Sequence, residues 1–263
     1  MDWRPIEGMS DQPMDLRPLF DGIFGKQRTV LYKRPDFERR NLDDMLKELA
    51  KIPLLQWDRY VFSREPLDGR ISASQRQVYM QKAWDCGVEW ADKSKIKYGN
   101  LSAEKLANAL GMKVEYVSMP ENTDRVLFAE FREPNHIRVY MDAINRVKDF
   151  LDSDNIKDII GDTNIADILL LHELFHSIEE KHKKEIYTKI EKIRLWSIGF
   201  FHYDSCIVAL SEIAAMAFAY RYSGIKFSPY LIDVILVYGY SENEASGLYE
   251  EMIELFNRRL EEI

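Results

Sequence analysis

The sequence feature that most constrains this chain is the stretch ILLLHELFHSIEE, residues 168–180. It contains the pattern H-E-x-x-H at His172, Glu173 and His176. Residues four positions apart lie on the same face of an α-helix, so both imidazoles can bind one ion while Glu173 lies beside them. This pattern is typical of zinc hydrolases. In these enzymes two histidines bind the metal, the glutamate takes a proton from the attacking water, and one position stays open for substrate.

Apolar residues surround the motif on nearly every side of the predicted helix, which indicates a buried helix. These residues are Ile165, Ile168, Leu169, Leu170, Leu171, Leu174, Phe175 and Ile178. Polar side chains without partners in such surroundings destabilise a protein by several kcal/mol as an order of magnitude. A metal ion resolves this conflict, whereas a pair of solvated surface histidines, the alternative, does not suit a buried helix. We therefore predict bound Zn²⁺.

A catalytic zinc ion needs a third protein ligand, and His182 is the first candidate. It follows His172 by ten residues, which is the spacing of the metzincin signature. In that signature a glycine breaks the helix before the third histidine. Here Glu179 stands at that place, within a segment of good helix formers. On an unbroken helix His182 would lie about 15 Å along the axis from His172, so we expect it to be solvated.

The second candidate is Glu212, the only charged residue in the apolar run SCIVALSEIAAMAFAY, residues 205–220. An isolated buried carboxylate is unfavourable and requires a partner, which is either the metal or an arginine such as Arg194 or Arg221. Several alanines would let this helix approach the His172 helix closely, namely Ala209, Ala214, Ala215, Ala217 and Ala219. The favoured metal site is therefore His172, His176 and Glu212, a gluzincin-type ligand set.

Three polar residues, His202, Tyr203 and Asp204, directly precede the predicted Glu212 helix. A zinc peptidase uses a His or Tyr donor to stabilise the oxyanion, and His202 or Tyr203 could take that catalytic role. Aromatic packing is the alternative for both residues. Asp204 is expected to be the N-cap of the helix.

The composition is that of an ordinary globular protein, with 46% apolar and 30% charged residues. The net charge of −8 argues against direct nucleic-acid binding, which needs clustered Lys and Arg. Cys86 and Cys206 lack the spacing of a disulfide framework or a thiolate zinc site. The sequence shows no signal peptide, and the longest apolar run is interrupted by Glu212. We therefore expect a cytoplasmic protein that does not enter a membrane.

The chain divides into an N-terminal extension of unassigned role, residues 1–70, and a domain over residues 71–263. Residues 113–118 alternate like a strand, and residues 125–141 read as a hairpin with EPN at its turn. Helices are predicted at 72–94, 102–110, 143–151, 164–184, 186–197, 205–223, 229–237 and 242–260. The expected fold is an α+β domain in which a small antiparallel or mixed sheet packs on one side of a helical bundle.

Three segments of the chain resemble the ImmA/IrrE family of zinc metallopeptidases. Residues 101–126, LSAEKLANALGMKVEYVSMPENTDRV, resemble the family's helix that ends in Leu-Gly and is followed by a strand. ILLLHELFH resembles its H-E-L-G-H helix, and SEIAAMAFA, residues 211–219, resembles its E-x-x-A-x-x-F-A segment. The resemblance covers roughly residues 71–225. The chain departs from the family pattern at Phe175, where the family usually has glycine, and a bulky ring there is expected to narrow the site or change a helix contact.

The resemblance implies a zincin-like fold, with Zn²⁺ bound by His172, His176 and Glu212 and with Glu173 as the general base. It also implies a protein or peptide substrate, which in the family is a DNA-binding transcriptional repressor, in a bacterial or phage setting. The hairpin 125–141 would offer its edge strand to an extended substrate. Two alternatives stay open. One is a catalytically silent, metal-binding sensor or scaffold protein of the same fold, and the other is a zinc hydrolase that acts on something other than peptides.

Overall fold

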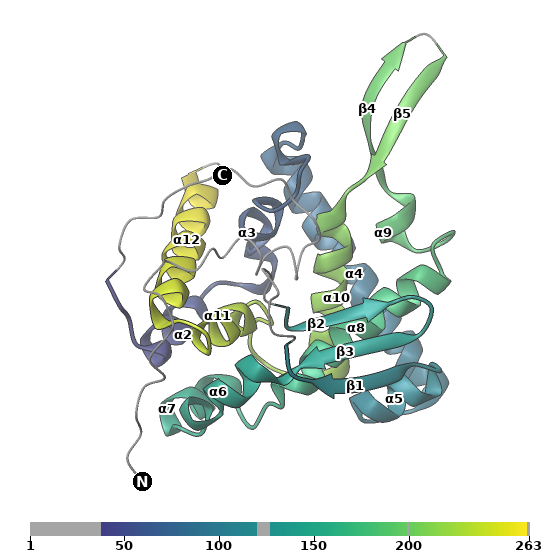
Figure 1. The fold of residues 1–263 in the computed structure, drawn as a ribbon. Helices are drawn as coiled ribbons and strands as arrows, with labels where there is room; N and C mark the ends of the chain where they lie inside the picture. The colour runs from purple at the N-terminus through teal and green to yellow at the C-terminus, as the bar shows by residue number, and fades with distance from the viewer. Residues whose placement is uncertain (1–37, 120–126, 199, 262–263) are drawn as a thin grey trace.

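The structure is a computed structural model, and it describes residues 38–119, 127–198 and 200–261. Helices dominate these residues, and the strands form one sheet of three strands and one of two (Figure 1). The predicted α+β class is therefore confirmed. Residues 1–37 of the predicted N-terminal extension, and residues 120–126 of the segments that resemble the peptidase family, lie outside the described residues.

Three long helices build the centre of the molecule: α4 (Ala73–Tyr98), α8 (Ile165–Lys181) and α10 (Val208–Ser223). The predictions at 164–184 and 205–223 overlap α8 and α10 almost completely. Helix α8 begins at Asn164, whose side chain accepts a hydrogen bond from the Ala166 amide and so satisfies one free donor of the first turn. Apolar side chains cover most of its circumference, and twelve of its seventeen residues are buried. Helix α10 covers part of this surface.

Helix α10 packs against both α8 and α4 through small side chains. The approach to α4 is so close that a Cβ added to Gly87 would lie 2.1 Å from the carbonyl oxygen of Ala214 and 2.8 Å from the Cβ of Ala217. The contact with α8 includes larger groups, such as the Phe175 and Phe218 rings at a centroid distance of 5.9 Å. The alanines of α10 thus permit a close contact, and part of that contact is made with α4 rather than with α8.

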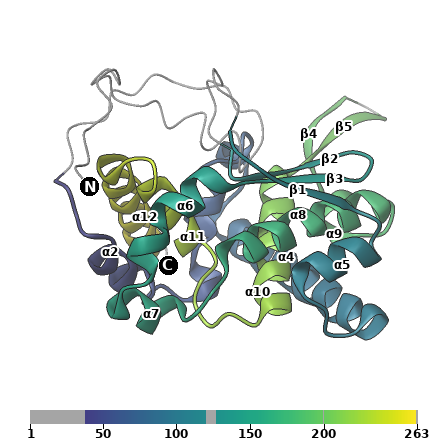
Figure 2. The same ribbon diagram turned by 60° about the horizontal axis from the view of Figure 1, so that its bottom comes forward.

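The larger sheet contains three strands in the order β1-β3-β2, with the bounds β1 (Lys113–Val117), β2 (Ala129–Arg132) and β3 (His136–Tyr140). Strand β3 runs parallel to β1 and antiparallel to β2, which confirms the predicted strand and hairpin. Helix α5 (Ala103–Ala109) leads into β1 through Gly111 at φ 76°, a conformation that favours glycine. The sheet lies against α8, and β2 is its edge strand on that side (Figures 1 and 2).

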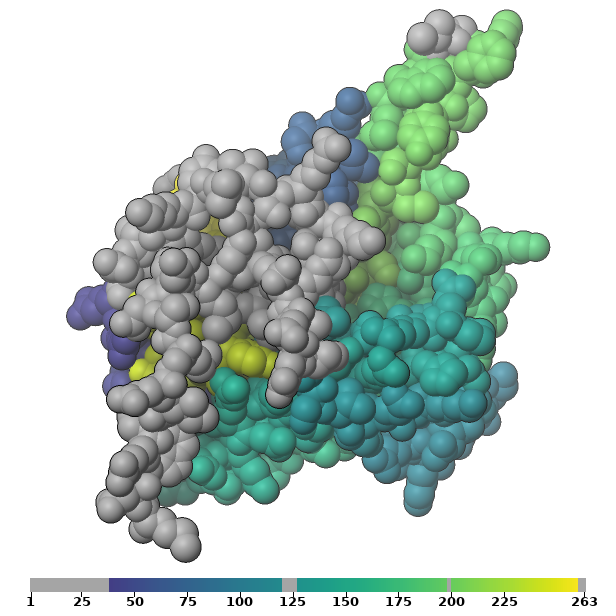
Figure 3. Space-filling model, viewed as in Figure 1, coloured from purple at the N-terminus to yellow at the C-terminus, as the bar shows by residue number. Residues whose placement is uncertain are grey.

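A second pair of strands, β4 (Lys192–Ile198) and β5 (Phe201–Cys206), forms an antiparallel hairpin. The prediction of a helix over 186–197 is therefore wrong, since only α9 (Tyr187–Ile190) is helical there. The segment alternates polar residues with aromatic and β-branched ones, which fit an extended chain better than a helix. The hairpin stands out from the body of the molecule, as the space-filling view also shows (Figures 1 and 3).

The remaining helices surround this centre: α2 (Leu42–Leu49), η1 (Leu54–Gln56), α3 (Asp58–Phe62), η2 (Asp68–Arg70), α6 (Met141–Leu151), α7 (Asp154–Ile160), α11 (Leu231–Tyr238) and α12 (Glu242–Glu261). The predictions at 143–151, 229–237 and 242–260 agree with α6, α11 and α12 to within two residues. Helix α7 was not predicted.

The described part of the predicted N-terminal extension belongs to the same hydrophobic core as the rest of the chain. Helix α2 buries Met45 and Leu46 completely, and α3 buries Phe62. Helices α3 and α12 are also joined by a buried ion pair, in which Arg259 of α12 donates to Asp58 of α3 at 2.6 Å. Two segments that are about 200 residues apart in the sequence thus close one core.

None of the helices among the described residues is both long enough and apolar enough to span a bilayer.

Candidate metal centre

Helix α8 places His172 and His176 one turn apart on the same face. Their Nε2 atoms lie 3.1 Å from each other, and the two rings meet edge to face at a centroid distance of 4.9 Å. His172 is only 6% exposed, and its Nδ1 has no hydrogen-bond partner among the described residues. The helical spacing of the motif therefore brings two imidazole nitrogens to one point, as the sequence predicted.

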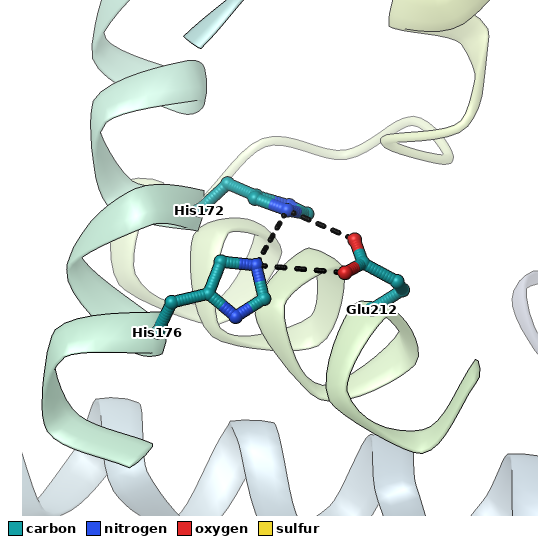
Figure 4. A group of neighbouring side chains, drawn as sticks. All are labelled: His172, His176 and Glu212. Carbon is teal, nitrogen blue, oxygen red and sulfur yellow. Dashed lines mark hydrogen bonds and ion pairs between the residues drawn. The ribbon is translucent and has the colours of Figure 1, made fainter. Parts of the chain in front are cut away.

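Helix α10 brings the Glu212 carboxylate to the same point (Figure 4). Its Oε2 lies 3.2 Å from His172 Nε2, and its Oε1 lies 3.7 Å from His176 Nε2. The two arginines that were alternative partners have other acids: Arg194 binds Asp204, and Arg221 binds Asp92. One donor atom from each of the three site residues lies within 4.8 Å of the other two.

The electrostatics of this cluster suit a cation. Burial alone lowers the pKa of His176, but the carboxylates of Glu212, Glu179 and Glu173 outweigh it and raise that pKa to about 9. The Glu212 Oε2 atom is buried and accepts no hydrogen bond from any described residue. Two imidazole nitrogens and a carboxylate are the donor set of a His-His-Glu zinc site, and the negative charge around them favours a cation. The residues present therefore fit zinc.

Glu173 lies beside the cluster rather than within it. Burial raises the pKa of its carboxyl above the usual value, although the His176 and His172 imidazoles and a hydrogen bond from the backbone amide of Phe131 lower it in part. Phe131 belongs to the edge strand β2, so this strand passes directly over the acid. A carboxylate with a raised pKa next to a metal-binding pair is suited to accepting and returning a proton.

A second carboxylate, Glu179, lies on the Nδ1 side of the His176 ring, with its Oε2 atom 3.7 Å from Nδ1. The Ser211 hydroxyl donates to Glu179 Oε2 at 2.7 Å and lies 3.3 Å from His176 Nδ1. Thr188 donates to Oε1 at 2.5 Å, and the Lys189 ammonium lies 2.9 Å from Oε2. Burial alone would raise the pKa of Glu179, but His176, Lys189 and Thr188 lower it to about 2.

A third carboxylate, Glu65, holds the start of α10. Its Oε2 accepts a hydrogen bond from the Ala209 amide at 3.0 Å, and its Oε1 accepts one from the Leu67 amide at 3.0 Å. A carboxylate at the N-terminus of a helix satisfies free N–H groups and favours the helix dipole. Asp204, the predicted cap, instead lies in β5, so that prediction is wrong; residue 207 occupies the N-cap position. Glu212 lies one turn inside the end that Glu65 caps.

The cluster opens into a cleft of about 410 Å³ between strand β2 and the first turn of α10. Its walls include Glu173, His176 and Glu212, together with Ala129 and Phe131 of β2. Lys189 at the foot of the β4–β5 hairpin and the exposed thiol of Cys206 lie at its rim. The cleft therefore joins His176, Glu212 and the acid Glu173 to solvent along the free edge of the sheet, whereas His172 does not line it.

The structure does not bring the other predicted catalytic residues to this cleft. His202 and Tyr203 lie in β5 and are exposed, and neither lines the cleft. Tyr203 stacks on Trp196 of β4 at a centroid distance of 6.4 Å, which is the packing alternative for this residue. Their position follows from the hairpin that replaces the predicted helix.

Two further residues near the motif, His182 and Phe175, also lie outside the metal centre. His182 lies beyond the end of the unbroken helix α8, where it packs on Trp90 and pairs with Glu185 at 2.5 Å, as expected for a residue that is not a ligand. The Phe175 ring is fully buried, packs on Phe218 of α10 and does not line the cleft, so it does not narrow the cleft.

Two residues of this centre, Glu179 and Glu65, are not predicted from the sequence. Glu179 follows His176 by three residues, a spacing that places both on one helical face, and it lies in an otherwise apolar part of a buried helix. That signal was available. No comparable signal exists for Glu65, because it reaches α10 from 144 residues away.

Comparison with protein-family models, with curated proteins and with solved structures gives no match for this chain.

Proposed function

We propose that the protein is a zinc-dependent peptidase of the gluzincin type, with a zincin-like fold and with likeness to the ImmA/IrrE family. The observation that carries the proposal is the convergence of His172, His176 and Glu212 at the end of an open cleft, with the acid Glu173 beside them. A purely structural metal site has no use for a free carboxylate at this place, so Glu173 favours an enzyme over a silent sensor or scaffold protein.

In the proposed reaction His172, His176 and Glu212 hold the metal. A bound zinc ion supplies Lewis acidity for the scissile carbonyl and lowers the pKa of water. Glu173 accepts a proton from the attacking water and returns it to the nitrogen of the leaving amine. Its raised pKa favours the first step, because a more basic carboxylate takes a proton from water more readily.

The free edge of β2 is the proposed place for the substrate. An extended peptide that added a strand there would lie across Glu173, since the Phe131 amide of this strand already contacts that acid. This mode selects unfolded or flexible segments of a protein, because a folded strand offers no free backbone groups. A flexible segment of a DNA-binding repressor is the proposed natural substrate by the family likeness, in the cytoplasm of a bacterium or in a phage-infected cell.

Glu173→Gln tests the proposal. We expect it to keep the zinc content of the wild type and to lower the hydrolysis of a fluorogenic peptide library by about 10²–10⁴-fold, the usual contribution of a general base. Glu212→Ala should lose both zinc and activity, and Glu180→Gln, the matched control at the cleft rim, should keep both. The readouts are metal analysis of the purified proteins and initial rates.

Three results would contradict the proposal in different ways. Zinc at full occupancy in Glu212→Ala would show that the ligand set is wrong. Zinc binding without hydrolysis in the wild type would favour the sensor or scaffold protein. Hydrolysis of small esters but not of peptides would favour a zinc hydrolase with another substrate.

A further inference from the structure

We propose that Glu179 is a positioning residue of the metal centre, which acts through Ser211 to hold the His176 imidazole in the tautomer that presents Nε2 to the metal. This proposal rests on the proposed zinc site, and it assigns a role to residues outside the ligand set and outside the general base.

The hydrogen-bond directions follow from the number of protons available. The Ser211 hydroxyl has one proton, and the short distance of 2.7 Å to Glu179 Oε2 shows where it points. At 3.3 Å from His176 Nδ1 the same oxygen can then only accept, so the ring proton lies on Nδ1. In the neutral imidazole that binds a metal, the lone pair therefore lies on Nε2, which is the atom that faces His172 and Glu212.

Glu179 is itself held in place by side chains from two other helices. It belongs to α8, Ser211 belongs to α10, and Thr188 and Lys189 belong to α9. Both carboxylate oxygens are engaged, and the residue is 2% exposed. A group with this many partners has little freedom to turn, so it transmits a fixed orientation to Ser211 and to the ring. Metal-binding histidines in proteins are commonly oriented in this way by a carboxylate behind them.

The competing explanation is that Glu179 serves only the fold, as the buried partner of Lys189. Variants of Ser211 and Lys189 distinguish the two explanations. A positioning role requires the Ser211 hydroxyl, whereas a structural ion pair requires the Lys189 ammonium and is indifferent to Ser211.

The test measures zinc affinity by competition with a chromogenic chelator, on the full chain, for four variants. We expect Glu179→Gln to weaken zinc binding by about 10–100-fold, the usual effect of losing such an outer partner, and Ser211→Ala to weaken it by a similar or smaller factor. Lys189→Met removes one contact of Glu179 but leaves Ser211 and Thr188 in place, so it should weaken zinc binding less than Ser211→Ala does. The neighbouring Glu180→Gln should stay within about threefold of the wild type. Urea unfolding of the metal-free proteins shows whether any variant has lost its fold.

A second readout does not depend on affinity. Nitrogen chemical shifts of the zinc-loaded wild type should show His176 protonated at Nδ1 and bound through Nε2. Unchanged affinity in both Glu179→Gln and Ser211→Ala, or a larger loss in Lys189→Met than in Ser211→Ala, would overturn the proposal. Zinc binding by the wild type with no peptide hydrolysis would leave it standing while the proposed function failed, and a wild type without zinc affinity would overturn both.

Discussion

A histidine lies beside an acid both in the buried helix α8 and in the exposed β4–β5 hairpin, but only the buried pair belongs to the candidate metal centre. In the helices His176 lies beside Glu179, and in the hairpin His202 lies 3.5 Å from Asp204. Glu179 is almost completely buried and takes bonds from two other helices, whereas Asp204 shares Arg194 and His202 at the surface. Neighbouring histidine and acid residues therefore make a candidate site only where burial excludes water and where other elements fix both partners.

The largest effect should come from the packing of the helices. Gly87→Ala forces a Cβ to within 2.1 Å of a backbone oxygen in α10, which cannot move aside without shifting the whole helix. We expect a loss of about 3 kcal/mol in the free energy of unfolding, the upper part of the usual range for overpacking. Urea unfolding followed by circular dichroism measures this.

Gly69→Ala is the matched control for that variant, because nothing lies within 4 Å of a Cβ built at Gly69. It should leave the unfolding midpoint unchanged. Equal stability of Gly87→Ala and Gly69→Ala would mean that α4 and α10 are not packed as tightly as described.

A smaller effect is expected at the start of α10. Glu65→Ala removes the acceptor of the Ala209 amide and leaves that buried donor without a partner. The free energy of unfolding should fall by about 1–2 kcal/mol, the range for a lost helix cap. Chemical denaturation is the measurement, and Glu89→Ala, which removes an exposed acid of α4 paired with Lys93, should change little. If both variants behave alike, Glu65 does not hold the helix that carries Glu212.

The smallest effect is expected in the hairpin. Asp204→Ala removes the partner of Arg194 and His202, but all three side chains lie at the surface, where water replaces the lost contacts. The unfolding midpoint should not change measurably, at low or at high salt. A destabilisation as large as that of Glu65→Ala would show that the hairpin is as tightly coupled to the body as the helices are.

The sequence was sufficient for the parts of the molecule in which one local rule dominates. The 3.6-residue period places His172 and His176 together on α8, and the isolation of Glu212 in an apolar run indicates a buried partner. The alternation of residues in β1 and in the β2–β3 hairpin likewise predicts these strands. In each case the local pattern and the tertiary environment favour the same structure.

The sequence was not sufficient where distant contacts decide. His202 and Tyr203 are predicted to lie in a connection between helices 186–197 and 205–223, whereas they belong to strand β5 of a hairpin, which the alternating aromatic residues favour. Glu65 was set apart with the N-terminal extension, and only the folded chain shows that it caps the helix of Glu212. Glu179 was considered only as a helix former, because its role depends on Ser211, Thr188 and Lys189, which other helices supply.

The buried pair between Asp58 and Arg259 also has a consequence for how the protein is made. These two residues are separated by 201 positions, so α2 and α3 leave the ribosome long before their partner α12 has been made. Contacts between such distant parts of a chain form slowly, because a long loop must close first. Until α12 emerges, the apolar faces of α2 and α3 stay partly uncovered, and exposed apolar surface of this kind favours aggregation of a nascent chain.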